Sequence, residues 1–264
     1  MNRARQFRLA LFVLPLAVTS FAGNKPTQES VTSESPARAD IEELIRKSGA
    51  TVSVAFRSLD GTKELFLNAD APFDDPNALR IPVMITVYAA AESHNISLSD
   101  PVRAHGASAT PPPTIGELCE TMILQNSDPA TNLLLERFTL AGIRAQIRSL
   151  GLDGMDIGAA FPNSEKNHTS SRALAIALWK LATDRVINPD ASKAMVGLLA
   201  RSSLHSTANA SGSAAATAPV VLHDAVIIYG ARAFVLAIQV QGLKDYAASS
   251  ELVAKISKAL TDAM

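Results

Sequence analysis

Residues 51–67 read TVSVAFRSLDGTKELFL and contain two short apolar runs on either side of a turn signal. The first run alternates and is rich in β-branched residues, which favours a strand. The pair Asp60-Gly61 is typical of a tight hairpin turn, because glycine adopts positive φ angles without strain. Residues 64–67 then form the returning run. The stretch therefore predicts an antiparallel β-hairpin.

The segments around this hairpin predict a sheet built from both ends of the chain. Before it, Asp40 can cap a helix with Ile41, Leu44 and Ile45 on one face, and Gly49 can end that helix. Helical spacing recurs in the middle, and two apolar β-branched runs and an amphipathic helix follow near the end. The middle helices are expected at residues 78–92, 114–125, 130–138 and 170–181, the late strands at 219–229 and 233–241, and the last helix at 249–264.

This order of elements predicts an α+β protein. Strands at both ends of the chain would share one antiparallel sheet, formed from about residues 39–70 and 219–264. Residues 71–218 would form a helical lobe beside it. The sheet and the lobe together make one expected domain over residues 39–264.

The N-terminus has the pattern of a secretory signal peptide. Arg3, Arg5 and Arg8 precede an apolar run at residues 9–18 and the small-x-small triplet at residues 20–22. The apolar run is shorter than the ~20 residues that a membrane-spanning helix needs, which argues against the alternative of a membrane anchor. We expect a signal peptide at residues 1–22, a polar tether at 23–38, no membrane span after cleavage, and a periplasmic or secreted protein.

Composition excludes several classes of function. The 264 residues carry a net charge of -1, which gives no electrostatic case for binding nucleic acid or an anionic membrane. At 47% hydrophobic residues the chain is too apolar for a disordered protein. A single cysteine, Cys119, excludes an intramolecular disulfide, and the five histidines are scattered without ligand spacing. We expect no cofactor and no metal.

Five collinear segments resemble the class A serine β-lactamases and their penicillin-binding relatives, over about residues 40–262. The segments lie at residues 52–61, 65–70, 80–85, 122–134 and 223–225. The resemblance implies the β-lactamase/transpeptidase-like fold, a five-stranded antiparallel sheet flanked by N- and C-terminal helices beside an all-helical lobe. It also implies the family's activity, which is β-lactam hydrolysis through an acyl-serine intermediate.

The nucleophile motif of that family is altered in this chain. The family has Ser-x-x-Lys at a helix start, with the hydroxyl and the amine in hydrogen-bond reach. Asn77 and Arg80 stand at the matching positions. An amide is not a nucleophile of the required kind, and a guanidinium stays protonated and cannot act as a base. No serine stands three residues before any lysine in the chain.

The second motif, Ser-Asp-Asn, matches Ser127, Asp128 and Pro129. Ser127 keeps the hydroxyl that shuttles a proton to the leaving nitrogen in the family. Pro129 lacks the side-chain amide that bridges the family's lysine and the substrate. As local structure, Asp128 is expected to be the N-cap of a helix and Pro129 its first residue.

The remaining motif positions also lack the family's chemistry. Counting back from His223 places the Lys-Thr-Gly motif, which binds the substrate carboxylate in the family, on Ala214, Ala215 and Ala216; allowing a gap places it on residues 210–212. Neither choice carries a charge. The family's deacylating glutamate lies on a loop before a Thr-rich helix start, and the resemblance places Asp156 at that position.

Three hypotheses about function follow. The first is a non-catalytic homologue whose old cleft binds a β-lactam, a peptidoglycan-like peptide or a protein partner. The second is an active serine hydrolase that uses a displaced nucleophile such as Ser127, with Asp156 or a histidine as the base. The third is a structural or protein-interaction module of the cell envelope.

Overall fold

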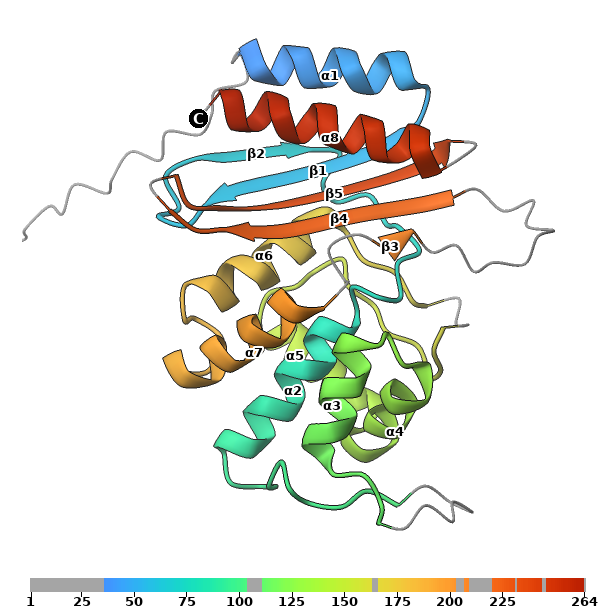
Figure 1. Ribbon diagram of the computed structural model, residues 1–264, viewed down its shortest axis with the longest axis vertical. Coiled ribbons are helices and arrows are strands. Elements are labelled where there is room, and N and C mark those ends of the chain that lie inside the picture. The colour runs from blue at the N-terminus through green and yellow to red at the C-terminus, as the bar shows by residue number, and fades with distance from the viewer. Residues whose placement is uncertain are drawn as a thin grey trace, which may run out of the picture.

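The computed structural model describes residues 36–103, 111–162, 166–202, 207–208, 220–230, 232–243 and 246–263, and shows an α+β fold. A sheet lies between a pair of helices and a helical lobe (Figure 1). The helices are α1 (Pro36–Ser48), α2 (Arg80–Glu92), α3 (Ile115–Leu124), α4 (Asp128–Phe138), α5 (Leu140–Ser149), α6 (Ser171–Ala182), α7 (Pro189–Arg201) and α8 (Tyr246–Asp262). The strands are β1 (Thr51–Ser58), β2 (Glu64–Leu67), β3 (Thr207–Ala208), β4 (Val220–Ile228) and β5 (Phe234–Leu243).

The sheet joins the two ends of the chain, as the sequence predicts. Its strand order is β2-β1-β5-β4-β3, and the described pairings are antiparallel. The β1 and β5 strands pair continuously, from Thr51 opposite Gln241 to Ser58 opposite Phe234. Four strands form almost all of the sheet, and β3 adds a two-residue strand at one edge.

The two faces of the sheet bury different partners. On the outer face, α8 packs on β5 and β4, and α1 packs on α8 (Figure 1). Alternate residues of β1 such as Val52, Val54 and Phe56 belong to this apolar cluster. The intervening residue Ala55 faces the other way and belongs to the core of the helical lobe. On this face of the sheet, α6 contacts β1. Because side chains alternate along β1, one face of the strand packs against the outer helices and the other face packs against the helical lobe.

The helical lobe is organised around α2, which is buried along most of its length. Met84, Ile85 and Val87 have no exposed surface, and α3, α4, α5 and α7 all contact α2. Helices expected near residues 78–92, 114–125, 130–138 and 170–181 are present. Two further helices, α5 and α7, were not predicted from the sequence. Each contains one glycine, Gly142 in α5 and Gly197 in α7, a residue that lowers helix propensity, although buried apolar residues such as Ile143, Ile147, Met195 and Leu198 recur at helical spacing.

The first helix begins earlier than predicted. It starts at Pro36, so Asp40 lies inside α1 and is not its N-cap, and residues 36–38 belong to the helix and not to a tether. Proline is well suited to the first turn of a helix, because the missing N–H would have no intrahelical partner there. The predicted helix end is confirmed, since Gly49 follows the last residue of α1 with φ of +68°.

In the described part of the chain, none of the helices has the length and apolar character needed to cross a bilayer. The predicted signal peptide at residues 1–22 lies outside the described residues. Its cleavage therefore stays a prediction.

The packing of the sheet predicts that two isoleucines on neighbouring strands contribute very differently to the free energy of unfolding. Ile238 in β5 has no exposed surface, whereas Ile228 at the end of β4 is 41% exposed. Replacing Ile238 by Ala should lower the free energy of unfolding by about 3 to 4 kcal/mol through lost burial and an unfilled cavity. Ile228→Ala should lower it by about 1 kcal/mol or less. Urea unfolding of both variants checks this, and equal losses would contradict the packing described above.

Candidate functional site

The start of α2 is a tight turn held by a buried carboxylate. The N–H groups of Leu79, Arg80 and Ile81 each donate to the carbonyl three residues earlier. Asp75, which is fully buried, accepts from the Ala78 N–H at 3.2 Å through Oδ1 and from the Gln239 side-chain amide at 3.3 Å through Oδ2. These contacts connect the beginning of α2 with β5 in the sheet. The turn also fixes where the side chains of residues 77 and 80 lie.

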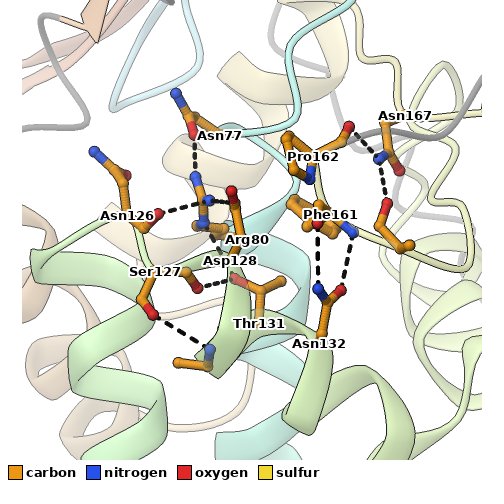
Figure 2. Close-up of polar contacts among 12 residues, drawn as sticks. Asn77, Arg80, Asn126, Ser127, Asp128, Thr131, Asn132, Phe161, Pro162 and Asn167 are labelled. Carbon is orange, nitrogen blue, oxygen red and sulfur yellow. Dashed lines mark hydrogen bonds and ion pairs between the residues drawn. The ribbon is translucent and has the colours of Figure 1, made fainter. Parts of the chain in front are cut away.

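Arg80 is the centre of a polar cluster between α2 and α4 (Figure 2). Its side chain is almost completely buried, and three of its nitrogens donate hydrogen bonds. Nε donates to Thr131 Oγ1 at 3.2 Å, and Nη1 donates to Asn77 Oδ1. Nη2 donates to the Asn126 carbonyl at 2.9 Å and to Asp128 Oδ1 at 2.5 Å. The planar guanidinium is therefore fixed on several sides at once.

The charge of Arg80 is balanced inside the cluster. Burial lowers the pKa of the Arg80 guanidinium, while the neighbouring Asp128 carboxylate opposes that shift. An arginine keeps its proton in proteins even under such conditions, so Arg80 is a buried cation that Asp128 neutralises. The Phe161 ring centroid lies 5.4 Å from the guanidinium carbon and adds a cation-π contact.

The structure brings Asn77 and Arg80 together, as the spacing of the resembled motif implies. The side-chain oxygen of Asn77 accepts from Arg80. In Figure 2 its nitrogen points away from Arg80. The amide of Asn77, the residue that the resemblance matches to the family's nucleophile, therefore serves as an acceptor for the neighbouring cation.

Ser127 is placed differently from the prediction. Its hydroxyl oxygen accepts from the Ala130 N–H at 3.3 Å, which makes Ser127 the N-cap of α4. Asp128 is the first residue of that helix, so its predicted role as the cap is wrong. The reason is electrostatic, because the Asp128 carboxylate turns toward Arg80. The Ser127 hydroxyl points away from Asn77 toward the start of α4 (Figure 2).

The two residues on either side of Ser127 both accept hydrogen bonds from Arg80. The resemblance assigns the bridging amide to Pro129, yet the side chain that bridges to the residue at position 80 is Asp128. Asn126, one residue before Ser127, contributes its carbonyl to the same cation. The assignment of the second motif to Ser127, Asp128 and Pro129 stays a prediction. The sequence analysis did not identify Asn126 and Thr131 as partners of Arg80, because it considered only the residues matched to the Ser-Asp-Asn motif.

Asp156 is held by its own loop and by Arg144 of α5, and not by Arg80. Its carboxylate accepts from the Ile157 N–H at 2.9 Å and forms an ion pair with Arg144 at 3.2 Å. Its backbone pairs with His168. The loop residue that reaches Arg80 is Phe161. The assignment of Asp156 to the glutamate position of the family stays a prediction.

Two asparagines fix the backbone of this loop, Asn132 from α4 and Asn167 from within the loop itself. Asn132 donates to the Phe161 carbonyl at 3.2 Å and accepts from the Phe161 N–H at 2.9 Å. Asn167 accepts from the Gly158 N–H at 2.8 Å and donates to the Ala160 and Pro162 carbonyls at 2.9 and 3.0 Å. Because backbone groups are held at both sides of Phe161, the ring is fixed over Arg80 (Figure 2).

The predicted Lys-Thr-Gly position cannot be compared directly. Ala214, Ala215 and Ala216 lie outside the described residues. The strand that pairs beside His223 is β3, with Thr207 opposite His223 and Ala208 opposite Leu222. In the described residues, no three His, Cys, Asp or Glu side chains are grouped closely enough to hold a metal ion.

The fold and the buried cluster at the start of α2 together define a protein of the β-lactamase/transpeptidase-like class. The model of the Beta-lactamase enzyme family matches residues 36–264. Because this match covers most of the chain, the protein belongs to the Beta-lactamase enzyme family.

Solved structures of low sequence identity share the fold. A β-lactamase from Sphaerobacter thermophilus DSM 20745 is 20% identical, with a TM-score of 0.69 over 84% of this chain and 95% of that chain. A protein called PBP-A is 20% identical, with a TM-score of 0.73 over 90% and 98%. A β-lactamase from Chitinophaga pinensis DSM 2588 is 16% identical, with a TM-score of 0.73 over 87% and 99%. No curated protein sequence matches this chain significantly.

The Arg80–Asp128 pair should be worth far more than a surface pair of the same chemistry. Asp128→Ala leaves a buried cation without its carboxylate and should lower the free energy of unfolding by about 3 kcal/mol, near the low end for a broken buried pair because Asp128 is partly exposed. Adding Arg80→Met should remove the uncompensated charge, so the double variant should lose less than the sum of the single losses.

The matched control is Asp70→Ala, which breaks the exposed pair of Asp70 with Arg172. That pair should contribute about 1 kcal/mol or less. Urea unfolding of Asp128→Ala, Arg80→Met, their double variant and Asp70→Ala measures these differences. Equal losses for Asp128→Ala and Asp70→Ala would show that the cluster around Arg80 is not a structural anchor.

Proposed function

We propose that this protein is a non-catalytic member of its family, which binds a ligand or partner in the old cleft without acyl transfer. The observation that carries the proposal is the burial of Arg80. At the position of the family's base stands a cation whose N–H groups are directed to Asn77, Thr131, Asn126 and Asp128. A guanidinium held in this way has no lone pair to accept a proton.

Acyl transfer also requires an activated nucleophile, and none of the described side chains in this region meets that need. Asn77 carries an amide. The Thr131 hydroxyl donates to the Ser127 carbonyl at 2.8 Å and accepts from a cation that cannot take its proton. The Cys119 thiol is buried, and burial raises its pKa to about 12, which suppresses the reactive thiolate. Removal of the nucleophile alone lowers turnover by roughly 10⁶ in a serine protease.

The displaced-nucleophile alternative gains little support from Ser127. Its hydroxyl oxygen accepts from the Ala130 N–H at the start of α4. The carboxylate of the next residue, Asp128, is paired with Arg80. A serine nucleophile needs a neighbouring base with a free lone pair that is aimed at its hydroxyl proton. No interaction of this kind is present among the described contacts of Ser127.

The proposed ligand class follows from the resemblance. A β-lactam or a peptidoglycan-like peptide is the molecule that the family's cleft accommodates, and here it would bind reversibly, because no acyl-enzyme can form. The third hypothesis, an interaction module of the cell envelope, differs in that a protein partner and not a small ligand would occupy the cleft.

Incubation with a chromogenic cephalosporin and with benzylpenicillin tests the proposal. We expect no hydrolysis above buffer by the purified protein or its Ser127→Ala variant, and no covalent adduct by intact-mass spectrometry, because no nucleophile is activated. Equilibrium dialysis against a peptidoglycan stem peptide then measures reversible binding. Turnover that Ser127→Ala abolishes would establish the hydrolase alternative. Absence of turnover and of any ligand, with a co-purifying protein, would favour the interaction module.

Export is part of the proposal and rests on the N-terminal pattern of residues 1–22. Expression of the full chain in a Gram-negative host should yield a periplasmic or secreted protein whose intact mass lacks these residues. The control is a variant in which the apolar run at residues 9–18 carries two added aspartates, which should stay inside the cell. Recovery of the full-length mass in the membrane fraction would instead indicate an anchor.

A further inference from the structure

We draw no further inference here: the strongest candidate, the apolar cavity bounded by α2, α6, α7 and the outer edge of β4, borders a part of the chain that lies outside the described residues, and nothing in the structure shows what covers it.

Discussion

The arrangement of the helical lobe depends on one buried cation. With only 1% of Arg80 exposed, its guanidinium cannot rely on water for hydrogen bonds or charge compensation. The chain meets this requirement with Asn77 from the turn before α2, with Thr131 and Asp128 from α4, and with the Asn126 carbonyl before α4. The need to neutralise one charge thus fixes the position of α4 relative to α2.

The same cluster is connected to the sheet and to the loop before α6. Asp75 links the start of α2 to Gln239 in β5, which in turn pairs with β1. On the other side, Asn132 holds Phe161 by its backbone, and the ring covers Arg80. Segments that are far apart in sequence therefore meet at a single polar centre.

The sequence was sufficient to predict the sheet and the helical lobe, but it was not sufficient to predict the contacts around Arg80. The alternation in residues 51–67 and the β-branched late strands predicted the shared sheet, because periodicity depends only on which face is buried. The role of Ser127 could not be predicted in this way. A Ser-Asp-Pro sequence is equally compatible with a cap at Ser127 or at Asp128, and the choice is made by Arg80, which lies 48 residues away from Asp128. Phe161 was missed for a similar reason, since its contact with Arg80 is purely tertiary.

The side chains of Asn77, Arg80 and Asp128 match one another in charge and in hydrogen-bonding groups. A guanidinium in this pocket has more N–H groups to satisfy than an ammonium, and they point in fixed in-plane directions. Asn77 supplies an acceptor in one of these directions, and Asp128 supplies both an acceptor and the countercharge. Serine at position 77 would offer a shorter acceptor, and asparagine at position 128 would offer no charge. Asn77, Arg80 and Asp128 therefore form a structural unit in which the buried charge and its hydrogen-bond donors are matched by acceptors and a countercharge.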